Sequence, residues 1–186
     1  MLSRNQIEKM GFAEVGDDVS ISEHANFYGV GYISIGNHVR IDDFCVISAG
    51  NRGIRIGNYV HIATHCSLIG QGKITMADFS GLSSRVSIYS SSDDYSGECL
   101  TNPTVPQEYK DVVTEDVYIG RHAIVGTGSV ILPGSILEEG VAVGALSLIR
   151  NRCAAFGIYF GSPAKRLRER SRNLLDLEKK LLDTDQ

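Results

Sequence analysis

The chain has 186 residues, a formal net charge of -4, 22% charged residues and 42% hydrophobic residues, which is the composition of one ordinary globular domain. This acidic balance gives no basic surface of the kind that binds nucleic acid. No apolar run approaches the roughly 18 residues that span a bilayer, and the first residues lack the apolar stretch of a signal peptide. We therefore expect no membrane span and a cytoplasmic location.

The N-terminal segment, residues 1–14, is predicted to hold a short helix over residues 3–10. Ser3 or Asn5 can cap the start of this helix, and Gly11 can end it. The segment precedes the repeats described next, so we expect it to sit at one end of the main domain.

A six-residue repeat occupies most of the chain from Val15 onward. Eighteen hexads can be written, among them VGDDVS, IGNHVR and IGRHAI. Every first position is aliphatic, Met or Phe, and seventeen of the eighteen fifth positions are Ala, Val, Cys, Ser or Gly, with Asn51 as the exception. An apolar residue at every sixth position does not form the apolar stripe of a helix, and it suits short strands joined by turns.

Three hexads make one triangular coil, so residues 15–162 are predicted to form an all-β solenoid of about six coils. At about 4.8 Å per coil, the solenoid would be on the order of 29 Å long. Cys45, Cys66 and Cys153 fall on fifth positions and are predicted to be small buried residues, with no disulfide framework.

The repeat is interrupted at length by a polar segment, predicted as an external loop over residues 90–116. Such a long loop in a regular fold is usually functional. After it the hexads resume, and a C-terminal helix is predicted over residues 163–186. Strong helix formers are frequent there, and leucines at helical spacing are expected to hold the helix against the solenoid. These leucines are Leu167, Leu174, Leu177 and Leu181.

The hexads, the segment SIYSSSDD before the loop, DVYIGRHAIVGTGSVILPGSILEEGVAVGALSLI after it and the closing GSPAKRL resemble the hexapeptide-repeat acyltransferases. The chain looks most like the maltose, galactoside and surface-polysaccharide O-acetyltransferase branch. The resemblance implies a left-handed parallel β-helix, a homotrimer and acetyl-CoA as the acyl donor, bound between neighbouring subunits.

The resemblance also implies positions for the donor. Small residues of the last coils would let the pantetheine chain reach backbone groups, although the same residues also suit the turns of a solenoid. Arg150, Lys165 and Arg166 would lie near the CoA phosphates and Pro163 near the adenine, although a basic run can also be a solvated face. The small residues are Gly126, Gly128, Gly144, Ala145 and Ser147.

The catalytic base departs from the family pattern. Maltose and galactoside acetyltransferases carry a His at the start of the loop, where this chain has Asp93. Two alternatives remain. Asp93 or Asp94 can act as the base, which is easier for an amine acceptor than for a hydroxyl. Otherwise His65, at an outward fourth position, can face the cleft and be oriented by one of these carboxylates.

Acceptor contacts are expected from the loop, because carboxylates, amides and aromatic rings suit a sugar. The candidates are Tyr95, Glu98 and Asn102 in the loop, with Asp42 and Asp43 of the hexad IDDFCV, which can also be plain turn residues.

The sequence thus predicts an acetyl-CoA-dependent acetyltransferase that acts on a sugar hydroxyl, in surface-polysaccharide biosynthesis. The alternative within the same fold is N-acetylation of a nucleotide-linked amino sugar. An Asp in place of His favours it, whereas the lack of a separate nucleotide-binding N-terminal domain in so short a chain weighs against it. A second competing function for the same fold is a zinc-dependent carbonic anhydrase. Its zinc ion would need three histidine ligands, for which His61 and His65 with His38 or His122 are the candidates. A scaffold without catalysis would show no CoA binding. We expect no metal.

Overall fold

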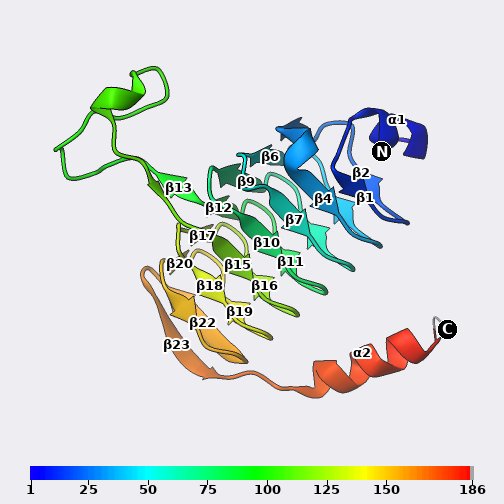
Figure 1. Cartoon of the computed structure of the whole chain (residues 1–186). Helices are drawn as coiled ribbons and strands as arrows, with labels where there is room; N and C mark the ends of the chain where they lie inside the picture. Colours follow the sequence, from blue (N-terminus) through cyan, green and yellow to red (C-terminus); the bar gives the residue numbers. More distant parts are fainter. Residues whose placement is uncertain (185–186) are drawn as a thin grey trace.

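The computed structural model describes residues 1–184 and begins with helix α1 (Arg4–Lys9). Ser3 is the N-cap residue, one of the two predicted, and its backbone N–H donates to Oε1 of Gln6 at 2.8 Å. Gly11 follows the helix with a φ of +80°. Ile7 is buried in the core, so α1 closes the N-terminal end of the fold (Figure 1).

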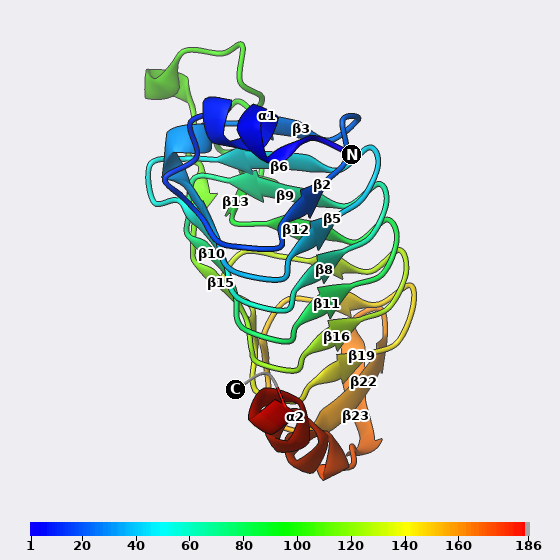
Figure 2. The ribbon, with the colours of Figure 1, turned by 90° about the vertical axis from the view of Figure 1, so that its right-hand side faces the viewer.

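The body of the protein is a parallel β-solenoid with three long sheets, here called sheets A, B and C (Figures 1 and 2). Sheet A holds β1 (Glu14–Val15), β4 (Ile33–Ile35), β7 (Ile54–Ile56), β10 (Ile74–Met76), β15 (Val117–Ile119), β18 (Ile136–Leu137) and β21 (Arg152–Cys153). Sheet B holds β2 (Ser20–Ile21), β5 (Arg40–Ile41), β8 (His61–Ile62), β11 (Gly81–Leu82), β16 (Ile124–Val125), β19 (Ala142–Val143), β22 (Gly157–Gly161) and β23 (Ala164–Glu169). Sheet C holds β3 (Asn26–Tyr28), β6 (Val46–Ala49), β9 (Ser67–Gly70), β12 (Ser87–Tyr89), β17 (Val130–Ile131) and β20 (Leu148–Ile149). Each of the first six coils therefore contributes one short strand to each sheet, and the chain then adds β21 to sheet A and β22 and β23 to sheet B.

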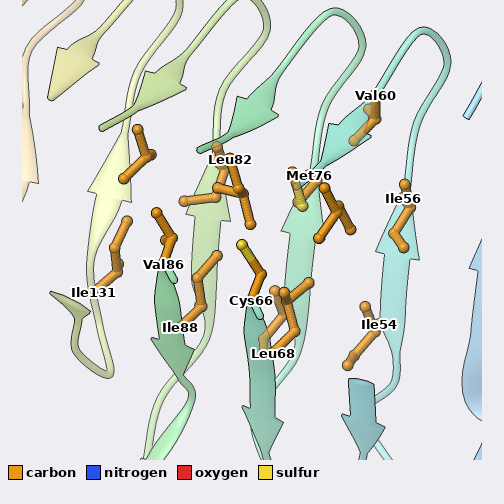
Figure 3. Packing of buried hydrophobic residues seen from close by; sticks show 14 of the residues in the cluster. Ile54, Ile56, Val60, Cys66, Leu68, Met76, Leu82, Val86, Ile88 and Ile131 are labelled. Carbon is orange, nitrogen blue, oxygen red and sulfur yellow. The ribbon is translucent and has the colours of Figure 1, made fainter. Parts of the chain in front are cut away.

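The hexad pattern explains the core. Sixteen of the eighteen first positions are buried, and only Val15 and Phe27 at the N-terminal end are partly exposed. Figure 3 shows such side chains, Ile56, Leu68 and Leu82 among them, pointing into the interior. The three cysteines at fifth positions are buried free thiols, as predicted. Most strands bury one large side chain, and four strands of sheet A bury two, which gives the solenoid a continuous apolar core.

The solenoid is one turn longer than predicted, because sheet A has seven strands and not six. The seventh turn begins with Cys153, at the fifth position of the last hexad, and continues into β22. The hexad pattern fades there, which is why the sequence predicts only six coils.

The corner between sheets A and B carries a stack of rings. His38, Tyr59, Phe79 and His122 follow one another with centroid distances of 4.5, 4.7 and 5.1 Å. All four have a φ between +54° and +59°, the left-handed conformation that a tight corner demands. The rings stack because each repeats the conformation of the coil before it.

The chain leaves the solenoid after β12 and returns at β15 (Figure 1). At the base of the long loop between β12 and β15, β13 (Ser91–Ser92) pairs antiparallel with β14 (Val113–Thr114). The connection between them carries a short 3-10 helix, η2 (Gln107–Tyr109), and a second one, η1 (Val30–Tyr32), lies in the first coil.

The prediction of a helix from Pro163 onward is wrong in its first part. Residues Ala164–Glu169 form β23, which pairs antiparallel with β22 at the end of sheet B. The open edge of a sheet offers hydrogen bonds that outweigh helix propensity there. Helix α2 spans Asn173–Thr184, and residues 185–186 of the predicted segment lie outside the described residues.

The leucine contact predicted for this helix is also wrong. Leu167, Leu177 and Leu181 are exposed and only Leu174 of the four is partly buried, and α2 meets the solenoid through the buried side chain of Glu178. Glu178 pairs with Arg121 and lies 3.0 Å from Nε2 of His122. The hydrogen bond from Arg121 outweighs burial and, with His122, lowers the pKa of Glu178. No helix within residues 1–184 is long and apolar enough to cross a membrane.

Candidate functional site

The outward side of sheet B aligns one residue from each coil. Strand pairing places Arg40 beside His61, His61 beside Gly81, and Gly81 beside Ile124. The turns that follow these strands form the corner between sheets B and C, here called the B–C corner. This corner gathers Asp42 and Asp43, Ala63, Ser83 and Ser84, and Gly126 and Thr127 from successive coils.

A hollow of about 280 Å³ lies where this row passes Gly81. It is lined by His61, Ala63, Gly81, Leu82, Ser83, Ser84, Ile124 and Thr127. A Cβ placed on Gly81 would meet only the backbone oxygen of His61, at an ordinary 3.8 Å. The φ of Gly81 is also not positive, so its backbone conformation is open to other residues. Neither packing nor conformation requires a glycine here, so its effect is to keep the hollow open.

Asp42 links the residues at the N-terminal side of the hollow. Its Oδ2 lies 2.8 Å from Nε2 of His61, and its Oδ1 accepts from Nε of Arg40 at 2.7 Å. Burial disfavours ionisation of this mostly buried side chain, but the hydrogen bonds from Arg40 and His61 outweigh it and lower the pKa of Asp42. Asp42 is therefore a carboxylate at neutral pH, held between two side chains that face solvent.

Four of the predicted donor-binding residues lie on the B–C corner at the C-terminal side of the hollow: Gly126, Gly128, Gly144 and Ala145. Ser147 belongs to the same corner but is buried. Its hydroxyl donates to the backbone oxygen of Gly144 at 2.7 Å and accepts from the N–H of Gly161 at 3.1 Å. The Ser147 side chain thus serves the packing of the last coils.

The predicted phosphate and adenine residues lie elsewhere. Arg150 and Pro163 line a small hollow of about 160 Å³ at the end of sheet C, next to the β22–β23 hairpin. Lys165 and Arg166 are exposed on β23 and not on a helix, and Arg166 pairs with Glu169 at 2.5 Å.

The structure does not bring His65 together with the loop carboxylates within one chain. His65 is exposed on the B–C corner, where Nδ1 lies 2.8 Å from the hydroxyl of Thr64 and the ring packs on Phe44 at 5.0 Å. Asp93 accepts from the backbone N–H of Asn102 at 3.4 Å. Asp94 accepts from the backbone N–H and hydroxyl of Ser96, which lowers its pKa.

The other predicted acceptor residues are divided between the loop and the B–C corner. Tyr95, Glu98 and Asn102 are exposed in the loop, with Tyr95 at 93% exposure. Asp43 accepts from the hydroxyl of Ser22, and its backbone oxygen accepts from Thr64 at 2.8 Å. The loop residues are therefore free to meet a ligand or another copy of the chain, whereas Asp43 also braces its corner.

Sequence reasoning missed Ser83, Ser84, Thr127 and Gly81 as lining of the hollow. Serine, threonine and glycine are common at the corners of any such repeat, so their residue types carry no signal. The alignment of β11 with β8 and β16 would have placed Gly81 between His61 and Ile124.

The histidines proposed for a zinc site do not assemble in one chain. His38 and His122 lie in the ring stack of the A–B corner, whereas His61 and His65 lie on the sheet B side. Within residues 1–184, no group of three His, Cys, Asp or Glu side chains could hold a metal ion.

A larger open groove of about 600 Å³ runs along sheet A. Its charged side chains are of both signs, with Arg55 and Lys73 near Glu14 and Asp78. None of the predicted site residues lines it, so the sheet B side remains the candidate site.

No protein-family model matches the chain. Among curated proteins, a dTDP-4-amino-4,6-dideoxy-D-glucose acyltransferase from Escherichia coli is 54% identical over 177 residues, which cover 95% of this chain and 92% of the relative.

Among solved structures, an N-acyltransferase is also similar to this chain over nearly its full length. AntD, an N-acyltransferase from Bacillus cereus in complex with dTDP and 3-hydroxybutyryl-CoA, is 42% identical with a TM-score of 0.94, covering 98% of this chain and 96% of that one. Other AntD structures are variants at a serine numbered 84 or an aspartate numbered 94 in that protein, and two of the serine variants hold dTDP-4-amino-4,6-dideoxyglucose with coenzyme A. A maltose O-acetyltransferase from Clostridium difficile is 19% identical with a TM-score of 0.60, covering 91% of this chain and 75% of that one, so it shares the fold alone.

Proposed function

Because the chain belongs to the β-helical acyltransferase family of these relatives, we propose that it moves an acyl group from coenzyme A to the amine of a dTDP-linked 4-amino-4,6-dideoxy sugar. The observation that carries this proposal is the 54% identity to an acyltransferase named for that substrate, over nearly the full length of both chains. The N-acylation alternative is therefore preferred to acetylation of a sugar hydroxyl. Acetyl and 3-hydroxybutyryl groups are both candidates for the acyl group.

The proposed reaction joins the amine to a thioester carbonyl. The amine nitrogen attacks the carbonyl carbon, the C–N bond forms, the C–S bond breaks, and coenzyme A leaves as a thiolate while the nitrogen loses one proton. An amine needs less help from a base than a hydroxyl does, because part of a sugar amine is unprotonated near neutral pH and nucleophilic as it stands, whereas a hydroxyl must lose its proton to attack well. This fits a chain that lacks a histidine at the start of the loop.

We place the acyl transfer at the Gly81 hollow. Ser84 lines it, and the donor would extend from there along Gly126, Gly144 and Ala145. AntD has been altered at a serine numbered 84 and an aspartate numbered 94, and this chain has Ser84 and Asp94 at those numbers. Asp94 remains the proposed partner for the amine, with Asp93 beside it.

Ser84 and Asp94 lie beyond opposite ends of strand β12 in sheet C, because Ser84 precedes β12 and the loop follows it. A site that uses both would draw on two copies of the chain, which supports the proposed homotrimer. Exposed apolar side chains on the B–C corner also support it: Phe44 is 53% exposed and Leu146 75%.

The test is an assay of thiol release from acetyl-CoA and 3-hydroxybutyryl-CoA with three acceptors. We expect release with dTDP-4-amino-4,6-dideoxyglucose, and none with the dTDP sugar that has a hydroxyl in place of the amine or with a simple galactoside. Mass spectrometry should show the acyl group on nitrogen. Release with the galactoside and not with the amine would return the assignment to O-acetylation.

A further inference from the structure

We propose that Arg40, held in place by Asp42 and His61, binds the diphosphate of the nucleotide-linked acceptor. This inference rests on the proposed function and adds to it the residue that recognises the nucleotide half of the substrate.

The first step is position. Arg40 and His61 are direct neighbours on β5 and β8, and His61 lines the Gly81 hollow. Arg40 thus lies two strands from Gly81 along sheet B, about 10 Å at the usual strand spacing. That separation suits a substrate whose amine is at the hollow and whose phosphates lie beyond the sugar ring.

The second step is direction. The predicted donor residues Gly126, Gly144 and Ala145 occupy the C-terminal side of the hollow. Donor and acceptor meet at one reacting carbon, so two long ligands in one cleft must extend away from it in different directions. The acceptor would then run toward the N-terminal coils, where Arg40 is the exposed cation of the sheet B row.

The third step is chemistry. Nε of Arg40 donates to Asp42, and within residues 1–184 the side chain makes no other hydrogen bond. The terminal nitrogens therefore stay available, and a guanidinium fixed at Nε offers them as a preformed fork for phosphate oxygens. His61 holds the other oxygen of Asp42, so the carboxylate is fixed from both sides. Asp42 acts here as a positioning residue.

Nearby acidic groups set the limit of this attraction. Asp42 itself and Asp43 lie close to Arg40, and Asp43 accepts a hydrogen bond from Ser22. Arg40 thus recognises phosphate through directed hydrogen bonds from its guanidinium more than through a strong local positive charge.

The test measures dTDP binding by calorimetry and steady-state kinetics for both substrates, with the full-length chain. For Arg40→Gln we expect dTDP affinity to fall about tenfold to a hundredfold, as for loss of a charge-assisted contact, and KM for the dTDP amino sugar to rise with it while kcat changes little. Asp42→Asn should give a smaller rise in the same KM. Arg55→Gln, an exposed arginine of sheet A, is the matched control and should behave as the unaltered protein.

Coenzyme A also carries a diphosphate, so the kinetics must separate the two ligands. A rise in KM for acyl-CoA with unchanged dTDP affinity would assign Arg40 to the donor and overturn the inference. Equal dTDP affinity in Arg40→Gln and the unaltered protein would overturn it as well, with the proposed function intact. If the unaltered protein neither binds dTDP nor acylates the dTDP amino sugar, the proposed function itself fails.

Discussion

Gly81 offers a way to close the candidate site without disturbing the fold. In Gly81→Val, the new side chain would stand on the outward face of β11, where a Cβ has an ordinary contact at 3.8 Å and no positive φ is needed. Valine suits a strand better than glycine and restricts the unfolded chain. We expect the free energy of unfolding to stay equal or to rise by up to about 1 kcal/mol.

Activity should respond in the opposite direction. The side chain would take up part of a hollow of about 280 Å³ and displace any reacting group that occupies it. Since a misplacement of about 1 Å can cost about a hundredfold in rate, we expect kcat/KM to fall at least about tenfold. Urea unfolding and thiol release on the same preparation would measure both effects.

Gly36→Ala is the matched control for this substitution. A Cβ at Gly36 would lie 2.7 Å from Oδ1 of Asn58 and 2.8 Å from the backbone oxygen of Gly57, on the sheet A side. It should lower stability by about 1–3 kcal/mol, with little change in the kcat/KM of the folded fraction. A stable Gly81→Val protein with unchanged kcat/KM would refute the placement of the reaction at this hollow.

Three further predictions concern stability. Glu178→Gln should weaken the attachment of α2 to the solenoid, because Arg121 and His122 lose a charged partner. A loss of about 2 kcal/mol in the free energy of this attachment corresponds to roughly thirtyfold faster amide exchange in α2. Unchanged exchange in α2 would contradict this role of Glu178. The lowered pKa of Glu178 gives the same contact a pH dependence, because its contribution is complete above the ordinary Glu pKa of about 4.3 and is lost as pH falls through the lower folded value. The protection factors of the α2 amides, which are corrected for the slower intrinsic exchange in acid, should therefore fall in acid in the unaltered protein and not in Glu178→Gln. Ile62→Ala, in a fully buried first position, should cost about 2–5 kcal/mol in urea unfolding, and a cost below about 1 kcal/mol would show that the core closes around the gap.

The solenoid core could be predicted from the sequence because its period is short and each position has one environment. Ile62 and Leu68 occupy first positions and Cys66 a fifth, and all three are buried as the pattern requires. The helix over residues 3–10 could also be predicted from the sequence, since the residues that begin and end it are local signals. The seventh coil was missed because its residues follow the hexad pattern only weakly.

The C-terminal segment shows where local reasoning fails. Lys165 and Leu167 have good helix propensity, yet they lie in β23 because the last strand of sheet B leaves hydrogen-bonding groups open. Leu177 was expected to face the solenoid, and Glu178 does so because Arg121 and His122 neutralise its charge. Both outcomes depend on partners far away in the sequence.

The candidate site was only partly predictable for a similar reason. Asp42 was recognised as a candidate, but its bonds to Arg40 and His61 join neighbouring coils, and the hexad alignment does not say which outward side chains meet. Asp94 was recognised from its place in the loop, and its bonds to Ser96 are local. Gly81 acts through the space that it leaves, which no single-residue pattern reveals.

The antiparallel strand β23 also has a consequence for the molecule as a whole. A stack of parallel coils has no natural last member, and its final strands could template the coils of another molecule. β23 reverses direction across the edge of sheet B and places Lys165, Arg166 and Arg168 along the outside, while α1 buries Ile7 at the other end. The end of sheet B therefore presents an antiparallel strand with three basic side chains in place of a bare parallel strand, and α1 covers part of the other end. This arrangement favours contacts between molecules at the sides of the solenoid, where the Gly81 hollow and the long loop lie.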